Sequence, residues 1–570
     1  MSGYHSRRIG TRVVAALFGL LLTLSTGPAP ADESPSSTGA AANADMNFRL
    51  QTEVSPTHHR TQSDTTADHS KFKALQGPFT SGPEVTQACL TCHTEAGHQF
   101  MKTTHWTWEY TNPKTGQKLG KHNLINNFCT NARGNEGMCA QCHAGYGWKD
   151  ETFDFKNQNN IDCLACHDRS GTYYKLPPSN GNKACAVMFE GQKPINWAKV
   201  AQSVGRPGRE NCGSCHFYGG GGDGVKHGDL DSSLIHANES LDVHMNEKGL
   251  NFACTMCHVS HQHQVSGSRY NIDAKDSIGT GKPGIRREAS TCESCHGMAP
   301  HPKLSIVGNK LNDHVSKIAC QTCHIPAMAR GGVATKIDWD WRTSGAVDKN
   351  GLGYKVDGYK QGNGEERDIY KSIKGTFKYG ENLTPHYAWF NGTMNYLTID
   401  TKFDHAKQPI AINALSGSAG DQDSRIWPFK RMHTIQPYDK GNNTLVYMHL
   451  WGNSADDKEA YWGNYNMGNA IAAGMKQFNK PYSGEFGFIQ TYSYWPITHM
   501  VAPKEDALAC HDCHAKNGRL KELTGFYMPG RDGGSTWLDR LGLALIALTL
   551  LGIAAHTAIR LWSRNEGDHK

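Results

Sequence analysis

The sequence has little excess charge of either sign. Its 570 residues include 59 lysines and arginines against 53 aspartates and glutamates, which gives a formal net charge of +6. The chain also has no basic stripe and no nucleic-acid-binding motif. This near balance argues against a protein whose main partner is nucleic acid.

The sequence also has few cysteines outside a single repeated motif, Cys-x-x-Cys-His. Of the 18 cysteines, only Cys129 and Cys185 stand apart from it. The other sixteen form eight Cys-x-x-Cys-His pentads: Cys89-Cys92-His93, Cys139-Cys142-His143, Cys163-Cys166-His167, Cys212-Cys215-His216, Cys254-Cys257-His258, Cys292-Cys295-His296, Cys320-Cys323-His324 and Cys510-Cys513-His514.

The histidine that closes every pentad decides what the motif binds. Neither a zinc ribbon nor a disulfide framework requires a histidine after each second cysteine, so both are disfavoured. In c-type haem attachment, two thioethers hold the porphyrin and the adjacent imidazole binds the iron. The sequence therefore predicts eight covalently attached haems, each with its pentad histidine as an iron ligand.

The remaining histidines bear on the second axial position of each iron. Thirty histidines less the eight in pentads leave 22. His5, His511, His556 and His569 are poorly placed, and the other 18 are enough for seven or eight irons. An iron that acts on a substrate keeps one exchangeable position, so one haem is expected to differ. The predicted second ligands are His105, His122, His236, His244, His261, His301, His314, His433 and His499.

Two long apolar segments lie at the start of the chain and at its end. The first follows three arginines, runs from Val13 to Leu24 and leads to a small-residue end at Ala31. This pattern predicts a secretory signal over residues 1–31. A flexible linker rich in Ser, Thr, Ala and Pro is predicted to follow over residues 32–67.

The second apolar segment predicts a membrane anchor. Leu541–Ile559 has no formal charge and is long enough to cross a bilayer. We expect a transmembrane helix over residues 537–562 and a cytoplasmic tail over 563–570, with tryptophans at the two interfaces and basic residues inside. The body, residues 68–530, is then placed on the periplasmic side of the inner (cytoplasmic) membrane.

The spacing of the pentads predicts the fold class. Seven of them are packed into residues 89–324, which leaves little polypeptide core for each haem. We therefore expect a mainly α fold with long irregular loops around stacked haems and little sheet. Residues 325–509 have no pentad and are rich in Trp, Tyr, Gly and Asn. We expect them to cover one side of the haems and supply second ligands, although a separate domain is also possible.

Several segments resemble the octahaem tetrathionate reductase family of multihaem c-type cytochromes, a more distant relative of hydroxylamine oxidoreductase and octahaem nitrite reductase. They are DHSKFKALQGPF, KTTHWTWEY, FCTNARGNEGMCAQCH and FYGGGGDGVKHGDLDSSL. The resemblance implies reduction of a small sulfur or nitrogen oxyanion, such as tetrathionate or nitrite, or of hydroxylamine. It also implies that the second haem is catalytic, has a lysine from outside its pentad as an iron ligand, and has a cysteine on its distal side.

The resemblance suggests which residues fill these roles. Cys129 matches the distal cysteine by its place before the second pentad, although a disulfide between Cys129 and Cys185 is the alternative. Lys226 is the preferred lysine ligand. His227 and Asp229 join it as predicted proton donors in the active site. The weaker lysine candidates are Lys183 and Lys193.

Two other functions remain open from the sequence. One is an oxidase of hydroxylamine or a sulfur compound, because iron chemistry alone does not set the direction of turnover. The other is an electron conduit between the quinol pool and periplasmic proteins. In each case the expected redox partner is a quinol dehydrogenase or a periplasmic cytochrome, and a structural calcium ion is a further expected cofactor.

Overall fold

The computed structural model describes residues 67–125, 131–175, 177–178, 193–282, 288–454, 457–533 and 536–567. Contacts divide the chain into two units, Met1–Gly39 and Ala40–Lys570, and every described residue belongs to the second. The predicted signal segment lies outside the described residues, as does nearly all of the predicted linker. Cys129, Lys183 and Cys185 are outside them as well.

All eight pentads lie on short helical turns or directly at their ends. One helical turn brings residues three apart to the same side, so both thiols of a Cys-x-x-Cys unit can reach one porphyrin. These turns are α1 (Gly82–Leu90), α4 (Glu136–Cys139) with η4 (Ala140–Cys142), α5 (Leu164–His167), α8 (Arg209–His216), η7 (Cys254–Met256), α9 (Cys292–His296), α11 (Cys320–His324) and α14 (Cys510–Cys513).

The other helices are mostly as short. They are α2 (Ala96–Phe100), α3 (Thr104–Thr107), α7 (Trp197–Gln202), α10 (Ile306–His314), α12 (Tyr461–Asn464), α13 (Met467–Gln477) and α15 (Thr536–Gly567). Single 3-10 turns are η2 (His69–Lys71), η3 (Lys73–Leu75), η5 (Gln158–Asn160), η6 (Ser232–Leu234), η8 (Trp341–Thr343) and η9 (Lys504–Asp506).

Residues 335–496 form a nine-stranded sheet. Seven strands follow the order β11-β15-β13-β5-β8-β7-β6, and β9 and β14 also pair with β13. The strands are β5 (Thr335–Asp340), β6 (Lys355–Lys360), β7 (Glu366–Lys371), β8 (Gly375–Gly380), β9 (His386–Phe390), β11 (Ile410–Ala411), β13 (Arg425–Asp439), β14 (Thr444–Leu445) and β15 (Phe486–Pro496). The described residues also contain three two-stranded ladders, made by β1 (Tyr110–Thr111) with β2 (Lys118–Leu119), β3 (Ser260–His261) with β4 (Gln264–Val265), and β10 (Met394–Tyr396) with β12 (Asn413–Leu415).

The sheet corrects the predicted fold class. The chain is 28% helical and 18% strand, so the expectation of little sheet is wrong, and a mainly α fold is only loosely supported. The cause lies in the composition of the pentad-free region. β13 and β15, which pair antiparallel along eleven residues, are rich in aromatic and β-branched side chains that favour strands. This region has a polypeptide core of its own and is not built on haems alone.

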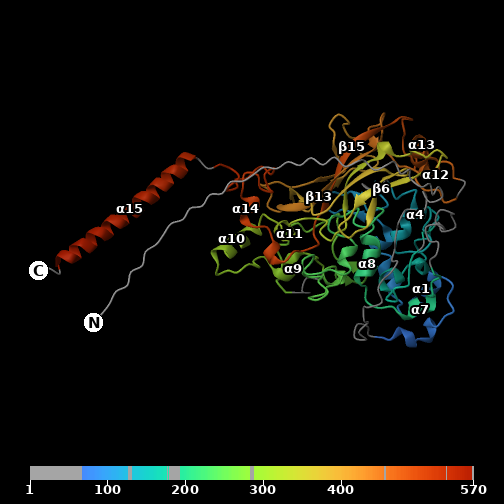
Figure 1. Ribbon diagram of the computed structural model, residues 1–570. Coiled ribbons are helices and arrows are strands. Elements are labelled where there is room, and N and C mark those ends of the chain that lie inside the picture. Colours follow the sequence, from blue (N-terminus) through green and yellow to red (C-terminus); the bar gives the residue numbers. More distant parts are fainter. Residues whose placement is uncertain are drawn as a thin grey trace, which may run out of the picture. The chain divides into compact units, whose positions relative to one another are not determined.

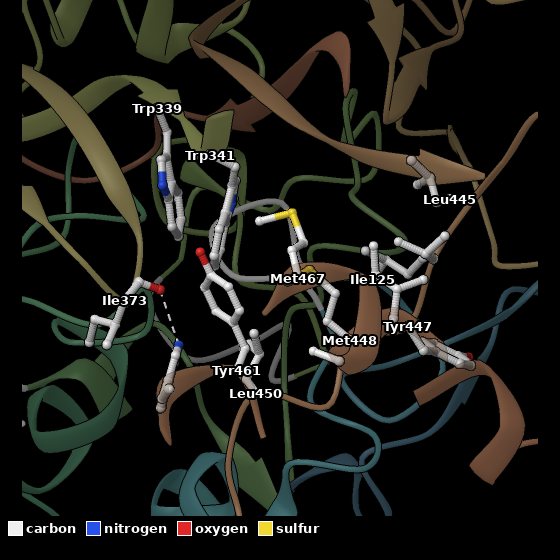
Figure 2. Close-up of a cluster of buried hydrophobic side chains, with 14 of the residues drawn as sticks. Ile125, Trp339, Trp341, Ile373, Leu445, Tyr447, Met448, Leu450, Tyr461 and Met467 are labelled. Carbon is white, nitrogen blue, oxygen red and sulfur yellow. Dashed lines mark hydrogen bonds between the residues drawn. The ribbon is translucent and has the colours of Figure 1, made fainter. Parts of the chain in front are cut away.

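That core is packed against the face of the sheet that α12 and α13 cover (Figure 1). Trp339 and Trp341 are fully buried and stack with their ring centres 5.1 Å apart, and Tyr461 of α12 lies beside Trp341 (Figure 2). Ala470 and Ile471 of α13 are also completely buried in this cluster. Such large aromatic side chains remove much apolar surface from water, which fixes the sheet as a rigid support.

Strand β13 ties the sheet to two pentad helices. The backbone carbonyl of Ile426 accepts hydrogen bonds from Ala319 N (3.0 Å) and Thr322 Oγ1 (2.7 Å), next to and within α11. The guanidinium of Arg425 forms a buried ion pair with Glu293 of α9. The pentad-free region therefore contacts the pentad-bearing region directly, through specific polar bonds.

Helix α15 spans Thr536–Gly567 and contains the predicted transmembrane segment, residues 537–562. Within it, Trp537–Ser563 is 27 residues long and apolar enough to cross a membrane, and none of it is buried against the rest of the protein. By length and composition, this helix is a candidate membrane span.

Candidate haem ligands and active site

Six pentad histidines each face a second imidazole. Two nitrogens that bind one iron from opposite sides, each about 2 Å away, place their ring centres roughly 6 Å apart. The observed separations of ring centres lie between 6.0 and 6.4 Å. The pairs are His93–His69, His216–His105, His258–His499, His296–His244, His324–His301 and His514–His314. The residues present thus fit bis-imidazole haems at six of the pentads.

A seventh pentad histidine has an imidazole close by. Burial lowers the pKa of His263, and the nearby His167 of the third pentad lowers it further. The Nδ1 atom of His263 lies 3.0 Å from Gln99 Oε1, which leaves its Nε2 atom available. His263 follows β3 in the sequence and is the imidazole best placed for the third haem.

The Nδ1 atoms of several paired histidines are held by the protein. A hydrogen bond at Nδ1 fixes the ring and directs Nε2 to a metal. Backbone carbonyls accept from Nδ1 of His167, His258 and His514, each over 2.9 Å. Among the opposing histidines, Nδ1 of His301 lies 3.1 Å from Asn312 Oδ1, and Nδ1 of His499 lies 3.0 Å from Asp229 Oδ2.

The structure brings together five of the nine predicted second ligands with a pentad histidine. Those five are His105, His244, His301, His314 and His499. Sequence reasoning missed His69 and His263. His69 lies at the edge of the predicted linker, and His263 lies two residues beyond the predicted His261 in the same hairpin.

Among the described residues, the other four predicted second ligands have different surroundings. His236 is exposed and bonds Glu247 over 2.7 Å, whereas His261 lies exposed on a two-residue strand. His433 bonds Asp338 across the β13–β5 pair, which raises the pKa of the imidazole. His122 lies between two carboxylates. His511, which is poorly placed in the sequence as an iron ligand, is exposed beside Asp512.

The second pentad does not follow the pattern. The Nε2 atom of His143 donates a hydrogen bond to the carbonyl of Trp106 over 2.7 Å, while its buried Nδ1 has no partner among the described residues. Burial and then the charge of Lys175 lower the pKa of this imidazole to about 3. The ring is enclosed by aromatic side chains, namely Trp106, Trp108, Trp148, Phe153 and Phe155. With its Nε2 bonded to a backbone carbonyl, His143 differs from the six pentad histidines that face a second imidazole, and its role as an iron ligand stays a prediction.

A buried lysine lies against this pentad instead. The Nζ atom of Lys175 donates a hydrogen bond to the backbone carbonyl of His143, and it lies 3.6 Å from the buried carboxylate of Asp162. Asp162 in turn accepts hydrogen bonds from the hydroxyls of Tyr146 (2.9 Å) and Tyr173 (2.8 Å). Sequence reasoning missed Lys175; the available signal was its place in TYYKLPP, eight residues after the third pentad.

Lys226, the lysine predicted to bind iron, lies in a cationic group around Trp495 of β15. Its Nζ atom is 4.9 Å from the centre of the Trp495 ring, and the ring of His227 is 5.2 Å from it. Burial lowers the pKa of His227 well below its usual value, and the charges of Lys226 and Arg269 lower it further. These effects favour the neutral form of the His227 imidazole, and its role as a proton donor stays a prediction.

Asp229 is a positioning residue for His499. Its carboxylate is fully buried and accepts hydrogen bonds from the backbone nitrogens of Thr498 (2.7 Å) and His499 (3.0 Å), as well as from His499 Nδ1. A carboxylate in this arrangement orients a metal-binding imidazole. The Oδ2 atom accepts all three bonds, whereas the buried Oδ1 atom has no hydrogen-bond partner among the described residues. The role of Asp229 as a proton donor stays a prediction.

Arg269 is a second functional candidate that the sequence did not indicate. Its guanidinium carbon lies 3.8 Å from the centre of the Trp495 ring and within 6 Å of the rings of Tyr270 and Tyr396. These cation–π contacts hold the charge in place. Among the described residues, no carboxylate or carbonyl accepts a hydrogen bond from it, which leaves its N–H groups available to an anion.

The cationic group reaches the second pentad. A hydrogen bond from Cys215 lowers the pKa of the Cys142 thiol, and the positive charges of three lysines add to this effect. Those lysines are Lys121, Lys175 and Lys226. The second haem would thus lie near three lysines.

Cysteines of neighbouring pentads lie near enough to shift each other's thiol pKa. The pairs are Cys89–Cys163, Cys166–Cys212, Cys142–Cys215, Cys212–Cys254, Cys257–Cys295, Cys292–Cys320 and Cys323–Cys513. In space, the pentads therefore follow the order first, third, fourth, fifth, sixth, seventh and eighth. The second branches from the fourth.

Two other expectations receive no support. The described residues contain no group of three or more His, Cys, Asp or Glu side chains that could hold a metal ion, so they offer the predicted calcium no such site. Lys193 is exposed, and its backbone carbonyl accepts a hydrogen bond from Tyr174.

Comparisons with known proteins show the family of the chain. Residues 336–517 match the family described as bacterial cytochrome c. An uncharacterized protein of Archaeoglobus fulgidus is 27% identical over 256 residues, which are 37% of this chain and 84% of that protein. A crystal structure of octaheme cytochrome c from Shewanella oneidensis is 40% identical with a TM-score of 0.65, and the match covers 80% of this chain and 95% of that one. This chain belongs to the octahaem multihaem c-type cytochromes.

Proposed function

We propose that the protein carries eight c-type haems and is a reductase of a small sulfur or nitrogen oxyanion, with its active site at the second haem. One observation carries this proposal: six pentad histidines face a second imidazole, a seventh, His167, has His263 nearby, and His143 has its Nε2 bonded to Trp106 instead. Saturated irons transfer electrons, whereas an iron with a different ligand set can bind a substrate.

Lys175 is the residue best placed to replace His143 as the protein ligand of the second iron. Its Nζ already lies against the backbone of the second pentad and is buried beside Asp162. The bound haem would supply an exchangeable iron position and electrons at that place. The chain orients the lysine through Asp162 and its two tyrosines, and the aromatic residues around His143 exclude water.

The cationic group around Trp495 suits an anionic substrate. Lys226 and Arg269 place two positive charges on one aromatic ring, and Lys226 also acts on Cys142 of the second pentad. Guanidinium and ammonium groups recognise oxyanions through charge-assisted hydrogen bonds. Cys129, whose segment lies outside the described residues, remains the proposed distal thiol.

The nearness of neighbouring pentads would give electrons a route. A donor at either end of the row of seven haems would reach the fourth, whose Cys215 lies near Cys142 of the second. We place the body in the periplasm, with α15 as a C-terminal membrane anchor and a quinol dehydrogenase or periplasmic cytochrome as the donor. An anchored enzyme beside such a donor would stay close to the quinol pool.

Spectroscopy with added ligand tests the proposal. The oxidised protein is expected to show seven low-spin bis-histidine haems and one haem whose visible and EPR signals change with nitrite or cyanide. Steady-state turnover with reduced viologen is then expected with at least one of tetrathionate, nitrite and hydroxylamine. Eight low-spin haems that ignore both ligands, together with no turnover, would instead make the protein an electron conduit.

Changing Arg269 to glutamine is expected to raise the KM for the oxyanion about tenfold and leave kcat within a factor of two. The reason is that a guanidinium held for the substrate contributes about 1–2 kcal/mol to binding, in the ground state and the transition state alike. High salt should weaken substrate binding in the native protein more than in the variant. Steady-state kinetics at two salt concentrations measures both effects.

The matched control for this change is Arg206→Gln, at an exposed arginine whose surroundings are solvent. It is expected to leave both kinetic constants unchanged. An unaltered KM in Arg269→Gln would remove Arg269 from the substrate site, and the proposed reductase activity would stand without it.

A further inference from the structure

A histidine beside the second pentad lies between two carboxylates. The Nδ1 atom of His122 is 3.4 Å from Glu109 Oε1, and its Nε2 atom is 3.9 Å from Glu136 Oε1. The ring contacts Trp148, with ring centres 5.5 Å apart, and Trp148 also packs against His143. An imidazole that faces one carboxylate with each nitrogen can take a proton at one and release it at the other.

Exposure falls steadily along these three residues. The side chain of Glu109 is 59% exposed, that of His122 is 22% exposed, and that of Glu136 is only 4% exposed. The three groups therefore lead from solvent into the protein. Glu136 begins α4, three residues before Cys139, so the buried end lies at the attachment site of the second haem.

The charges around the group are suited to carrying protons. Burial raises the pKa of Glu136 to about 7, with the nearby Glu151 adding to this effect and Arg133 opposing it. Burial also lowers the pKa of His122, which Arg133 lowers further and the two neighbouring glutamates Glu109 and Glu151 raise. Arg133 is held over the ring of Phe478. A carboxyl that titrates near neutral pH can both accept and give a proton under working conditions.

We propose that Glu109, His122 and Glu136 form a proton relay from solvent to the second haem site. Glu109 takes a proton from water and passes it to Nδ1 of His122. Nε2 of the same ring gives up its proton to Glu136, and the ring then returns to its first tautomer. Glu136 releases the proton on the buried side, where the reduction consumes it. The relay rests on the proposed function and narrows it to reductions that need protons.

The three candidate substrates differ in the number of protons that their reduction consumes. Reduction of nitrite to ammonium and two waters takes up six electrons and eight protons, and reduction of hydroxylamine to ammonium and water takes up two electrons and three protons. Tetrathionate takes up two electrons as its central S–S bond breaks to give two thiosulfates, and it needs no proton. In each case, the electrons come from the reduced redox partner through the haems. One variant can therefore be tested with both kinds of reaction.

Glu136→Gln is expected to slow reduction of nitrite and hydroxylamine about tenfold or more and to leave tetrathionate reduction within a factor of two, in the intact protein with the same reduced viologen. In the native protein, the rate with nitrite should fall as pH rises through about 7, because Glu136 then loses its proton. That fall should be absent in the variant. His122→Asn and Glu109→Gln should act in the same direction, Glu109→Gln least because its carboxylate is the most exposed.

The relay can also be tested without measuring activity, by recording the infrared difference spectrum of the protein as the pH is changed. The native protein should show a buried protonated carboxyl whose C=O band disappears near neutral pH, and Glu136→Gln should lack it. The matched control is Glu247→Gln, which breaks another glutamate–histidine pair, with His236, on the exposed surface. It is expected to change neither the rates nor the band.

Three outcomes overturn the relay while the reductase activity stands. If Glu136→Gln slows the reduction of all substrates equally, Glu136 only supports the structure. If nitrite turnover is unchanged, protons reach the second haem site by another route. If the carboxyl band persists in Glu136→Gln, another group titrates near neutral pH. A native protein that reduces none of the three substrates would sink the proposed function itself. The infrared band of Glu136 would still appear in that case, so the two failures are distinguishable.

Discussion

Replacing Lys175 with alanine is expected to lower turnover by roughly 100-fold or more and to change the spectrum of one haem alone. Loss of groups that hold a metal's ligands in place already costs 10- to 100-fold, and loss of the ligand itself is expected to cost at least the upper figure. The Nζ atom of Lys175 lies against the second pentad, whereas no other pentad has a buried lysine at its backbone among the described residues. The seven other haems should keep their low-spin signals, as measured by EPR of the oxidised protein.

The variant also removes the positive charge beside Asp162, a buried carboxylate. Leaving such a charge unpaired costs about 3–5 kcal/mol and could unfold the site by itself. The double variant Lys175→Ala/Asp162→Asn avoids this, because the asparagine can still accept a hydrogen bond from Tyr146 or Tyr173. It is expected to fold with all haems attached and to show the same change at the second haem.

Two further lysines serve as comparisons. Lys193→Ala, at an exposed lysine, should leave the spectrum and the turnover unchanged. Lys226→Ala should weaken substrate binding and keep the spectrum of the second haem in the absence of substrate, since Lys226 lies over Trp495. If Lys226→Ala abolishes the unusual haem signal and Lys175→Ala does not, the two lysines have to exchange roles.

Haem attachment could be predicted from the sequence because the motif is local. All five residues of a pentad lie within about one helical turn, so spacing along the chain determines their arrangement in space. The second ligands depend on tertiary contacts and could be predicted only in part. His261 and His263 belong to one hairpin, and only the fold decides which of them turns toward His167.

The sequence did not indicate the proposed lysine ligand or the sheet, for related reasons. Lys226 lies in a glycine-rich segment that attracts attention, but Lys175 becomes conspicuous only when Asp162, two tyrosines and His143 surround it. The sequence does not indicate the sheet, because aromatic residues such as those of 325–509 can equally well cover porphyrins. In the structure, Trp339 and Trp341 pack against each other and against Tyr461, so these aromatic residues form a polypeptide core (Figure 2).

Replacing Arg425 with methionine is expected to lower the free energy of unfolding by about 3–5 kcal/mol. Arg425 is 1% exposed and Glu293 is 6% exposed, so the change leaves a carboxylate buried without its partner. Arg425 begins β13 and Glu293 lies within the sixth pentad, so this ion pair joins the sheet to a haem-bearing helix. Denaturant unfolding measures the loss, with the haem absorbance and tryptophan fluorescence followed together.

Two comparisons separate the ion pair from the packing of the side chains. The double variant Arg425→Met/Glu293→Gln removes both charges and should recover most of the lost stability, because two neutral groups of similar size need no compensation. Arg342→Met breaks the ion pair with Asp340, in which Arg342 is 54% exposed, and is expected to cost only about 0–1 kcal/mol.

The two probes also report whether the sheet and the haem region unfold as one unit. If the ion pair couples them, Arg425→Met should shift both transitions equally, because the sheet cannot open without exposing Glu293. If only the fluorescence transition moves, the sheet unfolds by itself and the hydrogen bonds of Ile426 with α11 do not bind the two parts together. A loss of less than about 1 kcal/mol in both transitions would show that water reaches Glu293 once the arginine is gone, and that the pair contributes as little as an exposed one.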